Sequence, residues 1–162
     1  MVTYKKGNLL ESNCDIIVHQ VNCKRVMGSG IAKQIRDKWP QVYNDYCNFI
    51  DIGYDNKHFD WSSNILGHIC WTEIDKDKYV VDFFSQDTYY PRGECHTDYY
   101  AFEKCCYKLK RMLKRLNMEK CVIGFPYKIG CGLAGGDWST VSKIIEEELS
   151  EYNVEIWEYK QQ

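Results

Sequence analysis

The stretch Asp15-Ile16-Ile17-Val18-His19-Gln20-Val21, followed by the turn Met27-Gly28-Ser29-Gly30, decides the fold class of this chain. A short and almost continuous apolar run is typical of a strand that is buried on both faces of a sheet. After the glycines, the apolar spacing of Ile31, Ile35 and Trp39 becomes helical. A buried strand that leads through a glycine turn into a helix predicts an α/β domain.

The rest of the chain continues this alternation. Further strands are expected at 2–6, 65–71, 79–84, 121–125 and 154–159, and further helices at 97–116 and 139–150. Pro40 either kinks the helix that begins at Gly30 or starts a second one, and Thr97 is the expected N-cap of its helix. The polar residues 51–63 are expected to form a loop, and the charged turn 75–78 a hairpin. The sequence predicts a single domain over residues 1–162.

Composition excludes several classes of protein. The chain has 162 residues, 44% of them hydrophobic, 3 prolines and a formal net charge of -2, which is typical of a globular domain. A dedicated duplex-DNA binder carries a strong basic excess because it neutralises phosphates, and this chain lacks that excess. No apolar run approaches the ~18–20 residues of a membrane-spanning helix, so we expect no membrane partner.

The nine cysteines are expected to be reduced. Their number is odd, and the sequence begins at Met1 without a charged and then apolar leader, so we expect a cytoplasmic protein. No C-x-x-C motif occurs and the four histidines are scattered, so neither a metal site nor a cofactor is expected. Most of the cysteines are interpreted as small buried hydrophobic residues.

Two glycine-rich turns, 27–30 and 130–136, follow buried strands and precede helices. In an open α/β sheet such positions lie at the carboxyl ends of strands, where ligands bind. Backbone amides of glycine loops and helix N-termini attract anions, so two facing loops would suit a diphosphate; the alternative is that each is only a tight turn. The second loop contains Gly130-x-Gly132-x-x-Gly135, but a Rossmann domain places that motif in its first βαβ unit, with more sheet after it than residues 136–162 can form.

Polar side chains at the end of the second strand are unusual for a buried position. His19, Gln20 and Asn22 need hydrogen-bond partners there, and a polar ligand would provide them. Alternation directs His19 to one face of the sheet and Gln20 and Asn22 to the other, so the three cannot reach one ligand unless the strand has already ended. His19 is therefore either a core histidine or a catalytic one. Asp137, which follows the second glycine turn, is either a general base or a helix N-cap.

Four segments together resemble the macrodomain family, whose members bind ADP-ribose. They are Lys6-Gly7-Asn8-Leu9-Leu10, His19-Gln20-Val21-Asn22-Cys23, Met27-Gly28-Ser29-Gly30-Ile31-Ala32 and Pro126-Tyr127-Lys128-Ile129-Gly130-Cys131-Gly132-Leu133. The sequence most resembles the branch that contains terminal ADP-ribose glycohydrolase, the yeast-type ADP-ribose 1''-phosphate phosphatase and related bacterial and phage proteins. The resemblance implies a three-layer α/β/α fold with a mixed, mostly parallel six-stranded sheet.

The resemblance also implies a set of ligand-binding residues. Asn8, where the family usually has Asp, and Leu9 would meet the adenine. Trp157 would either stack on the adenine or face the core, and Asn22 would bond to the distal ribose. The residues expected along the diphosphate and distal ribose are Gln20, Met27, Gly28, Ser29, Gly30, Ile31, Gln86, Ile129, Gly130, Cys131, Gly132 and Leu133.

The catalytic Lys and Asp of the glycohydrolase are absent, because Gln86 and Ala134 stand in their places. We expect instead that Asp137, His19 or Asp87 activates a water at the distal ribose or at a 1''-phosphate. The leading hypothesis is a monomeric hydrolase that removes ADP-ribose from a protein or nucleic acid, or phosphate from ADP-ribose 1''-phosphate. The alternatives are a non-catalytic ADP-ribose reader and a single-stranded RNA-binding protein that uses residues 107–115, whose cations are also typical of a solvated helix face.

Overall fold

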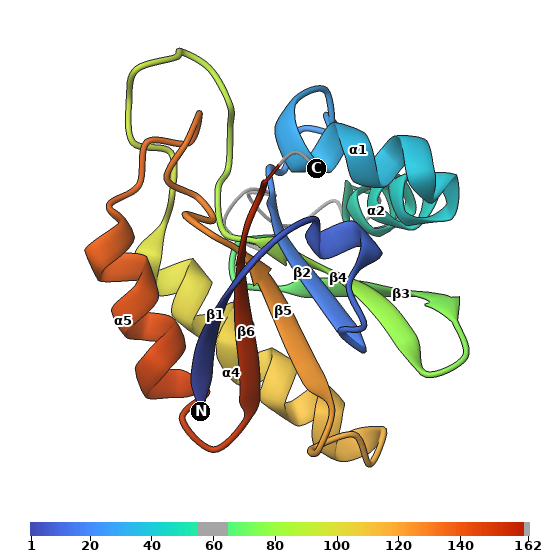
Figure 1. The fold of residues 1–162 in the computed structure, drawn as a ribbon. Helices are drawn as coiled ribbons and strands as arrows, with labels where there is room; N and C mark the ends of the chain where they lie inside the picture. The colour runs from blue at the N-terminus through green and yellow to red at the C-terminus, as the bar shows by residue number, and fades with distance from the viewer. Residues whose placement is uncertain (55–64, 161–162) are drawn as a thin grey trace.

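The computed structural model describes residues 1–54 and 65–160 (Figure 1). Six strands in these ranges form one sheet with the order β1-β6-β5-β2-β4-β3. Neighbouring strands are parallel except for β3, which is antiparallel to β4. The expected mixed, mostly parallel six-stranded sheet is confirmed.

The strands and helices lie close to the ranges expected from the sequence. The strands are β1 (Val2–Lys6), β2 (Ile16–Val21), β3 (Ile69–Asp75), β4 (Lys78–Phe84), β5 (Val122–Pro126) and β6 (Asn153–Glu158). The helices are the short 3-10 helix η1 (Leu9–Glu11), α1 (Gly30–Lys38), α2 (Pro40–Tyr54), α4 (Tyr99–Arg115) and α5 (Trp138–Glu148). None of these helices is long and apolar enough to cross a bilayer.

Helices cover both faces of the sheet, which gives three layers (Figure 1). The core under α4 and α5 includes Val18, Phe83 and Phe125, and the core under α1, α2 and η1 includes Ile17 and Phe84. Strand β2 contributes to both cores because its side chains alternate between the two faces. This double burial explains the almost continuous apolar pattern of β2.

The structure decides one boundary that the sequence left open and corrects two others. Pro40 starts a second helix and does not kink the first, since α1 ends at Lys38 and Trp39 is its C-cap, whose N–H donates to the Ile35 carbonyl. Helix α2 continues to Tyr54, so the expected loop does not begin at residue 51, and residues 55–63 lie outside the described part of the chain. Strand β3 begins at Ile69 and not at residue 65.

The N-cap of α4 is Asp98 and not Thr97. The Asp98 carboxylate accepts a hydrogen bond from the Ala101 N–H at 2.9 Å, whereas the Thr97 hydroxyl donates to the Gly130 carbonyl at 2.6 Å. The Thr97 hydroxyl therefore holds the loop that contains Gly130, and the neighbouring residue Asp98 caps the helix.

The carboxyl ends of the parallel strands meet at one edge of the sheet, at the top of Figure 1. There the loop from β4 to α4 (residues 85–98) stands beside the loop from β5 to α5 (residues 127–137). The His96 N–H donates to the Ala134 carbonyl at 2.7 Å, which ties the two loops together. The N-terminus of α1 lies at the same edge, so both predicted glycine turns meet there.

Candidate functional site

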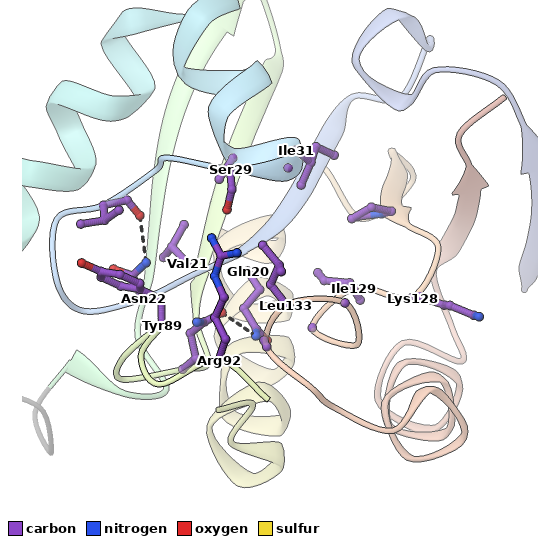
Figure 2. Close-up of a pocket in the computed structure, with 18 of the residues that line it drawn as sticks. Gln20, Val21, Asn22, Ser29, Ile31, Tyr89, Arg92, Lys128, Ile129 and Leu133 are labelled. Carbon is purple, nitrogen blue, oxygen red and sulfur yellow. Dashed lines mark hydrogen bonds between the residues drawn. The ribbon is translucent and has the colours of Figure 1, made fainter. Parts of the chain in front are cut away.

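A pocket of about 350 Å³ opens at this edge of the sheet (Figure 2). It lies between the end of β2, the start of α1, the β4–α4 loop and the β5–α5 loop. Its lining consists of Gln20, Val21, Asn22, Val26, Ser29, Gly30, Ile31, Ala32, Gln86, Tyr89, Arg92, Pro126, Tyr127, Lys128, Ile129, Gly130, Gly132, Leu133 and Ala134. Four segments that are distant in the sequence thus form one cavity, of the size that small-molecule ligands occupy.

The first wall of the pocket is the N-terminus of α1. Ser29 is the N-cap residue, but its side chain makes no capping hydrogen bond. Gly30, Ile31 and Ala32 follow it along the lining. The first amides of a helix lack intrahelical partners and carry a partial positive charge, so this wall favours an anion.

The second wall is the glycine-rich part of the β5–α5 loop. Among the described residues, the amides of Gly132, Leu133 and Ala134 donate to no protein acceptor, while those of Gly135 and Gly136 close turns onto Gly132 and Gly130. The two walls therefore present unpaired N–H groups to one cavity. This is the arrangement that the sequence predicted for a diphosphate.

The glycines of this loop have two different roles. A Cβ at Gly135 would lie 2.6 Å from the Glu94 carbonyl oxygen, and one at Gly136 would lie 2.5 Å from the Gly130 carbonyl oxygen. These two positions are glycine because the backbone packs closely there. A Cβ at Gly132 would have no neighbour within 4 Å, so packing does not require this glycine, and its open side is the one along which a ligand can approach.

A partly buried hydrogen-bond network joins the lining residues Gln20 and Gln86 to Ser85 and Thr97, which lie outside the lining. Ser85 Oγ donates to Gln20 Oε1 at 2.6 Å, and Gln20 Nε2 donates to Thr97 Oγ1 at 3.0 Å and to Gln86 Oε1 at 2.9 Å. The Thr97 hydroxyl continues the chain to the Gly130 carbonyl at 2.6 Å. The network fixes the β5–α5 loop relative to β2. Ser85 and Thr97 were missed in the sequence, where no local pattern distinguishes them.

Asn22 also shapes the pocket wall. Its Nδ2 donates to the Val26 carbonyl at 2.8 Å, and its Oδ1 accepts from the Lys24 N–H at 2.9 Å and from the Tyr46 hydroxyl at 2.9 Å. The Tyr46 hydroxyl has one hydrogen and also lies 2.7 Å from the Asn22 backbone carbonyl, so its bond to Oδ1 is shared. One amide hydrogen of Nδ2 remains for a ligand.

The charged lining residues are cationic. Arg92 and Lys128 line the pocket, and no carboxylate or imidazole does so in the described part of the chain. Figure 2 shows the Arg92 side chain extended among the labelled lining residues toward Ser29, whereas Lys128 points away from them. Arg92 and Tyr89 were missed because they lie in an irregular stretch without periodicity. The electrostatics of the pocket favour an anionic ligand.

His19 does not reach this pocket, so its catalytic interpretation is wrong. Its side chain is fully buried on the other face of the sheet, where Nε2 lies 2.5 Å from Asp82 Oδ1. Burial raises the pKa of Asp82, and the neighbouring imidazole opposes that shift. Strand alternation separates His19 from Gln20, so His19 is the core histidine of the two alternatives. Its expected separation from Asn22 is wrong, because β2 ends at Val21 and Asn22 bonds to Tyr46, which packs in the core on the His19 face of the sheet.

Of the two other catalytic candidates, Asp137 is the N-cap of α5. Its carboxylate accepts hydrogen bonds from the Thr140 N–H at 3.0 Å and from the Ser139 and Thr140 hydroxyls. These bonds lower the pKa of Asp137, which weakens it as a base, and it lies outside the lining. Asp87 also lies outside the lining, but it directly follows Gln86 and is half-buried, with Oδ1 3.3 Å from Lys24 Nζ.

Ten of the expected ligand-binding residues line the pocket, and six do not. Those outside the lining are Asn8, Leu9, Met27, Gly28, Cys131 and Trp157. Leu9 and Met27 are buried core residues, and the Asn8 side chain caps η1. The Trp157 ring packs against Gly7, and its indole N–H donates to Glu155 at 2.9 Å. The roles that the resemblance implies for these six residues stay predictions, and the contacts shown for Asn8, Leu9, Met27 and Trp157 are packing and capping contacts.

Known proteins share this architecture. The macrodomain of Thermus aquaticus DarG superposes with a TM-score of 0.74 at 24% identity and covers 99% of both chains. The chain has the macrodomain fold. No protein-family model matches it. The resemblance of its four sequence segments to macrodomains is confirmed by the structural match and by individual relatives.

Two relatives of this macrodomain carry names that state an activity. An ADP-ribose 1''-phosphate phosphatase of Scheffersomyces stipitis is 27% identical over 179 residues, covering 95% of this chain and 98% of that protein. A DNA ADP-ribosyl glycohydrolase of Mycobacterium tuberculosis is 24% identical over 143 residues, covering 88% of this chain. The macrodomain described here spans 37% of the length of the mycobacterial protein.

Proposed function

We propose that this macrodomain binds ADP-ribose and hydrolyses a bond at its distal ribose. The observation that carries the proposal is the pair of facing walls, the start of α1 and residues 132–134, which present unpaired amides to one pocket without a lining carboxylate. A diphosphate is the anion that such a pair fits, because each phosphate accepts hydrogen bonds from one wall.

The rest of the ligand is placed by the polar ends of the pocket. Asn22, Gln20 and Gln86 lie together at one end, with one free N–H on Asn22, so this end suits a ribose with its hydroxyl groups. Tyr89 and Arg92 lie at the mouth beside them. We place the distal ribose at this end, since the group attached to it then leaves through the mouth.

The names of the two relatives specify ADP-ribose in both cases and different bonds at its ribose. They support hydrolysis over binding alone for this chain. Cleavage requires a water that attacks the anomeric carbon or the 1''-phosphate, and a group that accepts its proton. Asp87 is the candidate base that remains, because Asp137 is occupied as a cap and His19 is buried elsewhere.

The test combines binding and turnover in one sample. Phosphorus NMR of ADP-ribose 1''-phosphate is recorded with the protein, and a single-stranded DNA carrying ADP-ribose is assayed in parallel by gel mobility. We expect the diphosphate signals to shift and one of the two substrates to be converted. Asp87→Asn is expected to keep binding and to slow conversion by ~10²–10⁴-fold. Asp137→Asn, which keeps a cap, is the matched control and is expected to retain turnover.

Three outcomes would each contradict a part of the proposal. Diphosphate signals that do not move at millimolar protein would exclude the ligand assignment. Binding without conversion of either substrate would identify a non-catalytic reader, and conversion unaffected by Asp87→Asn would remove Asp87 from the mechanism.

A further inference from the structure

A second depression lies far from the first pocket in the fold, between α4 and the edge strand β3. This groove has a volume of about 480 Å³. Cations of α4 line one side of it, and Trp71 and His68 line the other. None of its lining residues belongs to the pocket described above.

The cations form a stripe along one face of α4. Lys104, Lys108, Arg111 and Arg115 are spaced by four, three and four residues, so they lie above one another on the helix. Like charges at this spacing destabilise a helix. In the described ranges none of the four forms an ion pair with a carboxylate. The fold therefore holds a row of like charges that forms no ion pair within the described residues.

The neighbouring stripe of the same helix shows the contrast. Lys110 Nζ lies 3.1 Å from Glu148 Oε2, and Glu147 and Glu151 line the depression between α4 and α5 beside it. Arg111 lines this depression as well, so it has carboxylates near it on one side and the groove on the other. Lys108 and Arg115 line the groove but not this depression, and neither forms an ion pair in the described ranges, although the chain as a whole carries a net charge of -2.

An exposed aromatic side chain completes the groove. Trp71 is 40% exposed on the edge strand β3. His68 next to it accepts a hydrogen bond from Lys108 Nζ at 2.8 Å, which holds that ammonium group at the groove. Partial burial, together with the charges of Lys104 and Arg111, lowers the pKa of Lys108.

We propose that the groove between α4 and β3 binds single-stranded nucleic acid, with backbone phosphates along Lys108, Arg111 and Arg115 and a base stacked on Trp71. A row of cations beside an exposed indole is the combination by which proteins hold single strands. A duplex offers the phosphates but keeps its bases paired and stacked on one another, so it does not use Trp71. The site is separate from the ADP-ribose pocket and does not depend on the function proposed for it.

The test measures fluorescence anisotropy of a labelled 20-nucleotide oligothymidylate at several salt concentrations. Lys108→Ala/Arg111→Ala is expected to reduce the slope of log affinity against log salt by about 1.4, since each single-strand phosphate contact contributes ~0.7. Trp71→Ala is expected to weaken binding about 10-fold, and Trp71→Phe to restore most of it. Lys33→Ala/Lys143→Ala removes two exposed cations elsewhere and is the charge-matched control.

Three results would overturn the proposal. The first is an equal loss of affinity in the charge-matched control. The second is competition by duplex DNA that is as strong as competition by the single strand. The third is that the oligonucleotide does not bind, whereas anionic lipid vesicles bind and Lys108→Ala/Arg111→Ala abolishes that binding. Calorimetric titration with ADP-ribose is expected to be unchanged in the groove variants. If the unmodified protein does not bind ADP-ribose, the proposed function is contradicted, but the proposal for the groove is not affected.

Discussion

Replacing Thr97 by valine tests whether the buried network supports the ligand-binding loop. The Thr97 side chain is buried, donates to the Gly130 carbonyl at 2.6 Å and accepts from Gln20 Nε2 at 3.0 Å. Valine keeps the shape and removes both bonds. Each bond contributes ~1 kcal/mol net, so Thr97→Val is expected to cost about 2 kcal/mol of unfolding free energy. For a chain of this size that corresponds to a fall in Tm of about 4–8 °C.

The same variant is expected to weaken ADP-ribose binding. Gly130 begins the loop that carries the unpaired amides, and without Thr97 its carbonyl is no longer fixed. If ~1.4 kcal/mol of the stabilisation by Thr97 serves to hold the loop in its binding position, the affinity for ADP-ribose is expected to fall tenfold in Thr97→Val. Thermal unfolding and calorimetric titration measure the two effects, and Thr97→Ser, which keeps the hydroxyl, is the control. A Thr97→Val protein with unchanged Tm and unchanged affinity would refute the reasoning.

Three further predictions concern other parts of the molecule. Gly132→Ala is expected to leave stability nearly unchanged, because its Cβ would have no neighbour within 4 Å, and to weaken ADP-ribose binding; equal affinity by titration would show that no ligand approaches there. Asp82→Ala leaves His19 buried without its partner, so urea unfolding is expected to show a loss of ~3–5 kcal/mol, and a loss below ~1 kcal/mol would contradict a tightly paired core histidine. The lowered pKa of Asp137 means that its carboxylate stabilises the fold at neutral pH and that this contribution is lost as the pH falls through its folded pKa, below the ordinary value of 3.8. Acid unfolding of Asp137→Asn, which cannot titrate, is expected to lack this component, and an unchanged acid profile would disprove it.

Cysteine reactivity offers a comparison within one sample. Burial raises the pKa of the Cys131 thiol to about 11 and that of Cys23 to about 12, so both are expected to be inert to iodoacetamide near neutral pH. Cys95 is the exposed cysteine of the nine. Mass spectrometry is expected to find the first alkylation at Cys95, and prior modification of Cys131 would contradict the assigned burial.

Much of the fold was predictable because it depends on local periodicity. The buried run of β2 and the helical spacing after Gly30 identified the strand, the turn and the helix within one or two residues. Boundaries failed where a tertiary contact decided them. Thr97 satisfies the usual rules for an N-cap, but its hydroxyl is used by Gly130, and Asp98 takes the cap instead.

The sequence by itself determined the layer architecture and the two glycine turns at the ends of the strands, since composition and side-chain period express which surfaces must be buried. It also separated His19 from Gln20 by strand alternation. Only the tertiary structure decided which glycines pack and which one faces the pocket, and that Arg92 and the Ser85–Gln20–Thr97 network belong to the site. These features depend on contacts between segments that lie more than one hundred residues apart in the chain, such as those of Gln20 and Gly130. A local sequence pattern does not predict which distant segments come together.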